Sequence, residues 1–163
     1  MEDLGPPALS RFHLVSGLQA ALERYEFRLH FQPQVNLVSG TVQGVEALLR
    51  WQHPEHGLIG PDSFIAIAED SVLIDPLDAW VLRNASAQLK RWQDAGLPPL
   101  RMAINLSMRQ LIKPGLSALV ATVLEEAGLR PGQLSSSSKR QRWSTTTSPA
   151  LRPWSNSRSS APG

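Results

Sequence analysis

Hydrophobic and polar positions change their spacing several times along the chain, and each change marks a predicted element. Over 14–24 the apolar side chains recur at helical spacing, which predicts an amphipathic helix. Residues 26–37 alternate like a strand, and 42–51 form a second, more continuously apolar strand after a glycine-containing turn, so we expect an antiparallel hairpin. Residues 53–61 are typical of a loop, and a short helix is predicted over 62–70.

The next helix carries the strongest end signals in the chain. Asp75 is expected to cap it, Pro76 suits its first position, Asp78 lies near its positive end, and Gly96 ends it. Its predicted inner face is Leu77, Val81, Ala85, Leu89 and Trp92.

A third strand over 100–107 and a further amphipathic helix over 114–127, closed by Gly128, complete the periodic part of the chain. Strands that alternate with helices predict an α/β fold with parallel pairing after the hairpin. We therefore divide the chain into a leader at 1–13, a folded part at 14–134 and an irregular tail at 135–163.

The overall composition is that of a soluble protein. A length of 163 residues is enough for one domain, and the chain contains no cysteine, which excludes disulfides and thiolate metal sites. No apolar run reaches the roughly 18 residues of a membrane span, and the acidic, proline-rich start does not resemble a secretory signal. A cytoplasmic location is the expectation.

The basic pI of about 9.5 comes wholly from the tail. Residues 1–134 carry 11 Lys+Arg against 14 Asp+Glu, whereas 135–163 carry five basic residues, no acid and ten serines. This composition is typical of a disordered segment. Only Trp143 and Trp154 could stack on bases, so a nucleic-acid partner is not expected.

Two charged residues, Glu46 and Arg50, interrupt the apolar run of the second strand. Buried charges are costly unless they are paired or bind something. From the residues alone, the simplest interpretation is a structural ion pair on an edge strand. Asn105 would by itself be a turn former, and His53 with His56 resemble a weak metal pair but are not expected to bind a metal.

Several separated motifs change this interpretation. Residues 31–70 read "FQPQVNLVSGTVQGVEALLRWQHPEHGLIGPDSFIAIAED", with "QP" at 32–33, "EALLRW" at 46–51 and "AE" at 68–69, and "NLS" follows at 105–107. This ordered set, within a match from about Leu18 to Leu134, resembles the beginning of an EAL domain. The EAL family comprises bacterial phosphodiesterases that hydrolyse cyclic di-GMP.

The resemblance implies an incomplete TIM-like (β/α)8 barrel of the EAL type with an antiparallel first strand pair. It also implies a divalent metal, Mg²⁺ or Mn²⁺, held by hard oxygen ligands. Carried over to this chain, Glu46 and Asn105 would be metal ligands, and Arg50, Gln32 and Leu48 would contact the substrate, cyclic di-GMP. Intact family domains are often homodimers, so a homodimer is possible for the intact domain.

Beyond Leu134 the family pattern requires further acidic motifs and a general-base glutamate, and the tail contains no acid. We therefore expect a truncated, inactive chain. Out-of-frame translation of GC-rich codons for 134–148 gives an acidic string close to the one that the family places there, so a frameshift is the favoured origin of the tail. The alternative function is a non-catalytic module that binds cyclic di-GMP or another protein.

Overall fold

A long antiparallel hairpin forms one side of the computed structural model, which describes residues 11–136 and 141–142. Strand β1 (Phe27–Val35) pairs with β2 (Val42–His53), as the alternation predicted. The turn between them is stabilised by Asn36, whose side-chain oxygen accepts the backbone N–H groups of Val38 and Ser39 at 2.9 and 3.1 Å.

A short third strand follows where the sequence predicted only loop. Strand β3 (Gly57–Ile59) pairs antiparallel with β2, with Trp51 opposite Ile59 and His53 opposite Gly57. The loop prediction is therefore wrong for these three residues. The turn residues of "HPEHG" are those of a hairpin connection, but a strand this short gives no alternating pattern to recognise.

The elements besides β1, β2 and β3 are α1 (Arg11–Glu23), η1 (Pro61–Ser63), α2 (Ile65–Glu69), α3 (Ile74–Asp94), β4 (Arg101–Ile104), α4 (Met108–Ile112), α5 (Leu116–Ala127), β5 (Leu134–Ser136) and β6 (Gln141–Arg142).

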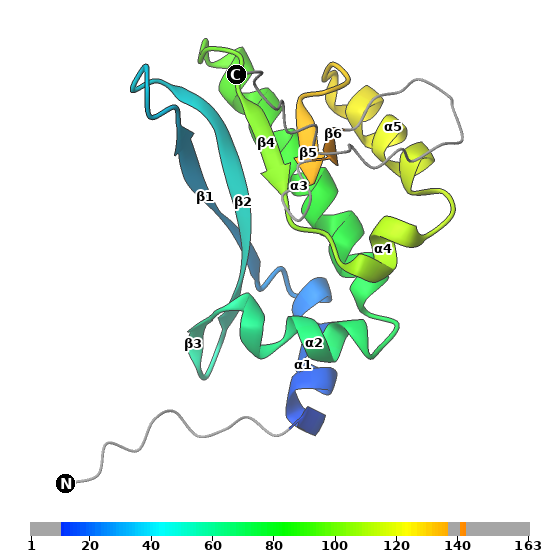
Figure 1. Ribbon diagram of the computed structural model, residues 1–163. Coiled ribbons are helices and arrows are strands. Elements are labelled where there is room, and N and C mark those ends of the chain that lie inside the picture. The colour runs from blue at the N-terminus through cyan, green and yellow to red at the C-terminus, as the bar shows by residue number, and fades with distance from the viewer. Residues whose placement is uncertain (1–10, 137–140, 143–163) are drawn as a thin grey trace, which may run out of the picture.

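Helices connect the later strands and allow parallel pairing. The six-stranded sheet has the order β1-β2-β4-β5-β6, with β3 attached to β2. Strands β2, β4 and β5 are parallel to one another, whereas β6 is antiparallel to β5. In Figure 1, α3 lies behind the middle of the sheet and α5 lies beside it.

Helix α3 begins two residues earlier than the sequence predicted, at Ile74 instead of Pro76. Its cap position is Leu73, which makes no side-chain capping bond, so Asp75 does not cap the helix. Asp75 instead lies in the first turn and accepts a hydrogen bond from Lys113 Nζ at 2.7 Å. Gly96 follows the end of the helix with φ +85°, a left-handed conformation that glycine adopts without strain.

The hydrophobic core lies between the sheet and its helices. Predicted inner-face residues of α3 are buried, with the exception of the half-buried Trp92. The core is closed by aromatic residues from several elements, and the indole of Trp51 is fully buried. Its largest fully buried side chains include Trp51, Phe27, Phe64, Leu82, Met102 and Ile104.

The predicted boundary between Leu134 and Ser135 falls inside a strand. Ser135 and Ser136 continue β5 and pair with Ala103 and Ile104 of β4. The rest of the predicted tail, apart from Gln141–Arg142, lies outside the described residues, as does most of the predicted leader. None of the helices in the described residues combines the length and hydropathy that a membrane span requires.

Candidate functional site

Strand β2 sorts its side chains onto two faces of the sheet. Successive residues of a strand point to opposite sides of the sheet. Side chains that face the hydrophobic core therefore alternate with side chains on the opposite side, which we call the outer face. The half-buried outer positions include Glu46, Leu48 and Arg50, three of the five predicted site residues. The buried positions between and beside them are Val45, Ala47, Leu49 and Trp51.

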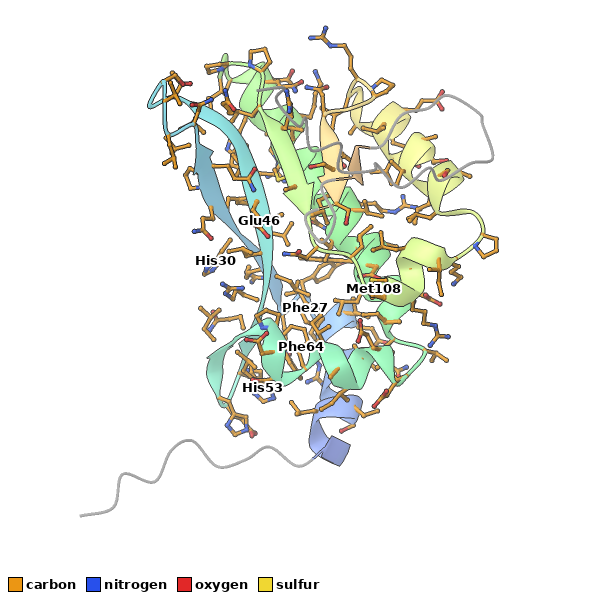
Figure 2. All side chains as sticks on the ribbon, viewed as in Figure 1. Phe27, His30, Glu46, His53, Phe64 and Met108 are labelled. Atoms are coloured by element: carbon orange, nitrogen blue, oxygen red, sulfur yellow. The ribbon has the colours of Figure 1, made fainter. Side chains whose placement is uncertain are left out.

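Glu46 and Asn105 meet on this outer face. Parallel pairing of β2 with β4 puts Glu46 beside Ala103, and Asn105 follows two residues later. Asn105 Nδ2 donates a hydrogen bond to Glu46 Oε1 at 2.8 Å. Figure 2 shows Glu46 near the middle of the long β2 strand. A carboxylate and an amide that are 59 residues apart in sequence thus form one polar pair.

Gln32 lies directly opposite Glu46 on the neighbouring strand, so the same face also carries this predicted residue. Arg50 Nη1 donates to the backbone oxygen of Leu49 at 2.7 Å. The expected ion pair between Glu46 and Arg50 is not among the interactions of the described residues, and this interpretation is wrong. Residues four apart on a strand are separated by about 13 Å, too far for an ion pair.

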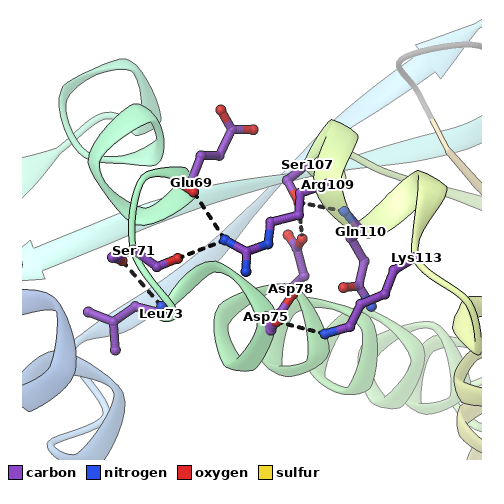
Figure 3. A network of polar contacts seen from close by, with 9 residues as sticks. All are labelled: Glu69, Ser71, Leu73, Asp75, Asp78, Ser107, Arg109, Gln110 and Lys113. Atoms are coloured by element: carbon purple, nitrogen blue, oxygen red, sulfur yellow. Dashed lines mark hydrogen bonds and ion pairs between the residues drawn. The ribbon is translucent and has the colours of Figure 1, made fainter.

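A buried hydrogen bond supports the segment that carries Asn105. Ser107 Oγ donates to Asp78 Oδ2 of α3 at 2.5 Å, and Ser107 Oγ also accepts the backbone N–H of Gln110 at 3.2 Å, which caps α4 (Figure 3). Burial raises the pKa of Asp78 from 3.8 to about 6, although both hydrogen bonds from Ser107 oppose the shift. This contact anchors the residues after β4 to helix α3.

Two further polar contacts join α4 and the residue after it to the α2–α3 connection and to the first turn of α3. Arg109 Nη1 donates to the backbone oxygen of Ser71 at 3.3 Å, and Lys113 Nζ donates to Asp75 Oδ2 at 2.7 Å (Figure 3). Both contacts are exposed, so each adds little stability by itself. Together with the buried bond of Asp78, they hold the segment 105–113 on the N-terminal turns of α3.

The described residues offer a metal ion only a partial ligand set. They contain no group of three or more His, Cys, Asp or Glu side chains that could hold a metal. The carboxylate of Glu46 and the amide of Asn105 are hard ligands of the type that Mg²⁺ and Mn²⁺ prefer. His53 Nδ1 instead accepts the backbone N–H groups of Glu55 and His56 at 3.1 and 3.3 Å, which is a structural role in the turn.

Sequence reasoning missed the hydrogen bond between Ser107 and Asp78, and it missed Arg28 as a residue of the outer face. Asp78 was predicted as a favourable charge at a helix end, and only its tertiary contact with Ser107 shows that it is buried. Arg28 lies directly opposite Arg50. The alternation of β1 was the available signal, because Arg28 and Gln32 are four residues apart and share one face of the strand.

The model of the EAL domain matches residues 16–146 of this chain. Among curated relatives, the chain is 42% identical over 127 residues to the bifunctional diguanylate cyclase/cyclic di-GMP phosphodiesterase MucR of Pseudomonas aeruginosa, covering 78% of this chain and 18% of MucR. It is 42% identical over 113 residues to the cyclic di-GMP phosphodiesterase PdeR of Escherichia coli, covering 69% of this chain and 17% of PdeR. The chain thus spans less than a fifth of the length of these relatives.

Solved structures give the same fold. The MucR phosphodiesterase in complex with cyclic di-GMP superposes with a TM-score of 0.72 at 43% identity, covering 74% of this chain and 49% of that one. The EAL domain of Pseudomonas aeruginosa FimX bound to cyclic di-GMP has a TM-score of 0.66 at 31% identity, covering 75% and 48%. The predicted barrel-type α/β fold is confirmed as a partial one, and the chain belongs to the EAL domain family.

Proposed function

We propose that this chain carries the first part of a metal-dependent phosphodiesterase site for cyclic di-GMP. Glu46 and Asn105 are the proposed metal ligands, and Gln32, Leu48 and Arg50 are the proposed substrate contacts. The observation that carries the proposal is the hydrogen-bonded pair of Glu46 and Asn105 on the outer face of the sheet. The relatives MucR and PdeR, which are named as cyclic di-GMP phosphodiesterases, support it.

The donor chemistry of this pair fits a hard divalent ion. A bound Mg²⁺ or Mn²⁺ lowers the pKa of a coordinated water and offsets the negative charge of a phosphodiester. Asn105 can bind such an ion only through its amide oxygen, so the amide must turn and release its N–H bond to Glu46. Two protein ligands with water and phosphate oxygens suit Mg²⁺, and we expect weak binding without substrate.

The proposed substrate contacts differ in their chemistry. The guanidinium of Arg50 can bind a phosphate oxygen through charged hydrogen bonds, and most of its donors are not used by the bond to Leu49. Leu48, between Glu46 and Arg50 on the same face, offers apolar contact to a flat guanine base. Gln32 has both a donor and an acceptor for the edge of a base.

We further propose that the chain does not turn over substrate by itself. The described residues contain no group of three or more His, Cys, Asp or Glu side chains that could hold a metal, and 135–163 contain no acid at all. We therefore expect that the part of the chain described by the structure does not supply a group that activates the attacking water. Binding and catalysis are separable, since the three proposed substrate contacts lie on β1 and β2 alone.

This separation gives the second candidate function, a binding module for cyclic di-GMP without catalysis. The two are distinguished by titrating the full chain with cyclic di-GMP in 10 mM Mn²⁺ or in a metal chelator, and by chromatographic detection of the linear dinucleotide. Binding without product supports the proposed site and the proposed inactivity. Product that depends on Mn²⁺ and on Glu46 would overturn the inactivity. The chain can also be fused to the missing part of an EAL domain, so that the domain is complete. If neither the wild-type chain nor this fusion binds cyclic di-GMP, the proposed function is overturned.

A matched pair of variants assigns the binding to this face. Arg50→Gln removes the proposed phosphate contact, and we expect affinity for cyclic di-GMP to fall about tenfold or more, as for loss of a charged hydrogen bond. Arg130→Gln removes the same charge from an exposed position in the α5–β5 connection and should leave the affinity unchanged. Equal losses in both variants would show a non-specific charge effect instead of a site.

A further inference from the structure

Two arginines lie directly opposite each other across the hairpin. In the β1–β2 register Arg28 pairs with Arg50, one step before Leu29 pairs with Leu49. Residues that pair directly across antiparallel strands point to the same face of the sheet, with their Cβ atoms about 5 Å apart. Arg28 is exposed and Arg50 is half-buried, so both guanidinium groups start from the outer face.

Neither arginine forms an ion pair within the described part of the chain. Arg28 Nη1 donates to the backbone oxygens of Tyr25 and Phe27, at 2.5 and 2.8 Å. Arg50 Nη1 donates to the backbone oxygen of Leu49 at 2.7 Å. Each guanidinium has five N–H donors, so Nε and Nη2 of both residues keep their hydrogen-bonding capacity.

Like charges directly opposite each other on a sheet destabilise it. A bound anion would offset that cost, because it can accept hydrogen bonds from both guanidinium groups at once. The neighbouring outer positions on β1 are His30 and Gln32, which also carry N–H donors. The acidic end of this face is Glu46, which lies about 13 Å from Arg50 along the extended strand.

We propose that Arg28 and Arg50 together form a phosphate-binding site, and that it holds one of the two phosphodiester groups of the cyclic dinucleotide. The other phosphodiester would then be the one near Glu46 and Asn105. The identity of the dinucleotide rests on the proposed function. The affinity for phosphate rests on the arginine pair alone, whose planar groups match the oxygens of a phosphate.

Arg28 also has a structural role that a test must separate from binding. It contacts the backbone oxygen of Tyr25, which has φ +57° and is therefore strained for a residue with a side chain. Loss of Arg28 could loosen this turn and weaken binding indirectly. Tyr25→Gly removes the strain at this position, so the variants are best compared in that background as well as in the wild type.

The experiment measures two ligands with the full chain and a set of arginine variants. Cyclic di-GMP binding is titrated at 50 and 200 mM NaCl. Binding of inorganic phosphate is measured as the rise in melting temperature between 0 and 50 mM phosphate, and chloride at the same ionic strength is the control. The variants are Arg28→Gln, Arg28→Lys, Arg50→Gln and Arg101→Gln, and Arg28→Gln is also made in the Tyr25→Gly background. Arg101 is an exposed arginine that lies opposite Gly44, at the other end of the sheet, and it serves as the control.

We expect Arg28→Gln to weaken cyclic di-GMP binding about tenfold and to abolish the phosphate effect on melting. Arg28→Lys should retain part of both effects, and Arg101→Gln should retain both fully. The inference is overturned if Arg28→Gln, in the Tyr25→Gly background, behaves like Arg101→Gln with both ligands.

The two proposals fail in different ways. If cyclic di-GMP does not bind but the phosphate effect still requires Arg28 and Arg50, the anion site stands and the proposed function fails. If cyclic di-GMP binding depends on Arg50 and not on Arg28, the proposed function stands and the arginine pair fails as a site.

Discussion

The hydroxyl of Ser107 donates a hydrogen bond to the carboxylate of Asp78 at 2.5 Å, and both side chains are buried. Asp78 belongs to the N-terminal part of α3, and Ser107 lies two residues after Asn105. The bond therefore links the helix that covers the sheet to the strand end that carries a proposed metal ligand. Its cost is a carboxylate removed from water, which is visible in a pKa raised to about 6.

The first prediction concerns pH. Because the folded-state pKa of Asp78 is raised from 3.8 to about 6, protonation stabilises the fold. This contribution is complete below pH 3.8 and is lost as the pH rises through 6. The raised pKa corresponds to about 2–3 kcal/mol between these limits. Asp78→Asn should remove that decline, as seen in urea unfolding between pH 4 and 7.5.

Asp62→Asn is the control for that experiment, since Asp62 is exposed on η1. It should leave the pH profile of the unfolding free energy unchanged. A profile of Asp78→Asn that is parallel to the wild type would show that Asp78 is not the group that titrates.

The second prediction concerns the donor. Ser107→Ala removes the hydrogen bond to Asp78 and the cap that accepts Gln110 N–H. We expect a loss of about 2–4 kcal/mol in unfolding free energy at pH 7.5, from a buried carboxylate without its donor and an uncapped helix. Ser107→Thr keeps the hydroxyl and should recover most of the loss. In the Asp78→Asn background the Ser107→Ala cost should be smaller.

Much of the fold could be predicted because its elements are periodic. The alternation of Phe27, Leu29 and Phe31 gave β1, and the helical spacing of Leu77, Val81 and Leu89 gave the buried face of α3. These patterns are local, so one sequence is sufficient to recognise them. Strand β3 was not predicted, because three residues are too few to show an alternating pattern. Its pairing with β2 depends on the tertiary structure.

The site was predictable only in part. The shared face of Glu46 and Arg50 follows from alternation, but an ion pair between them does not, because an extended chain keeps them about 13 Å apart. The contact between Glu46 and Asn105 depends on the parallel register of β2 and β4, which no local pattern fixes. The family motifs named both residues, and their roles as metal ligands stay a prediction.

The third prediction tests those roles with Mn²⁺. If the pair binds the ion with a dissociation constant in the millimolar range, 10 mM Mn²⁺ adds about 1 kcal/mol to the unfolding free energy. Glu46→Gln removes the charged ligand and should abolish the effect. Asn105→Asp adds a second carboxylate beside Glu46 and should enlarge it.

Glu125→Gln is the matched control for Mn²⁺, because Glu125 is exposed on α5 and away from the sheet face. It should respond to Mn²⁺ as the wild type does. A Mn²⁺ effect of equal size in Glu46→Gln and the wild type would remove Glu46 from the metal site.

The last prediction concerns the contact between α1 and the sheet. Gly17 of α1 lies so close to the fully buried Trp51 that an added Cβ would come within 3.0 Å of its ring atom Cη2. The indole cannot move easily, since it donates to Glu26 Oε2 at 3.0 Å and packs on the ring of Phe64 at a centroid distance of 5.7 Å. Gly17→Ala should therefore destabilise the protein by about 1–2 kcal/mol.

A second substitution reverses the sign of that effect. Trp51→Phe is itself destabilising, but phenylalanine lacks the outer ring atoms that meet the new methyl group. In that background Gly17→Ala should stabilise the protein by about 0.5–1 kcal/mol, because alanine favours the helix over glycine. Gly60→Ala, where an added Cβ meets nothing within 4 Å, is the control and should be near neutral in both backgrounds. Equal effects of Gly17→Ala in the two backgrounds, measured by urea unfolding, would show that the helix packs on the sheet differently.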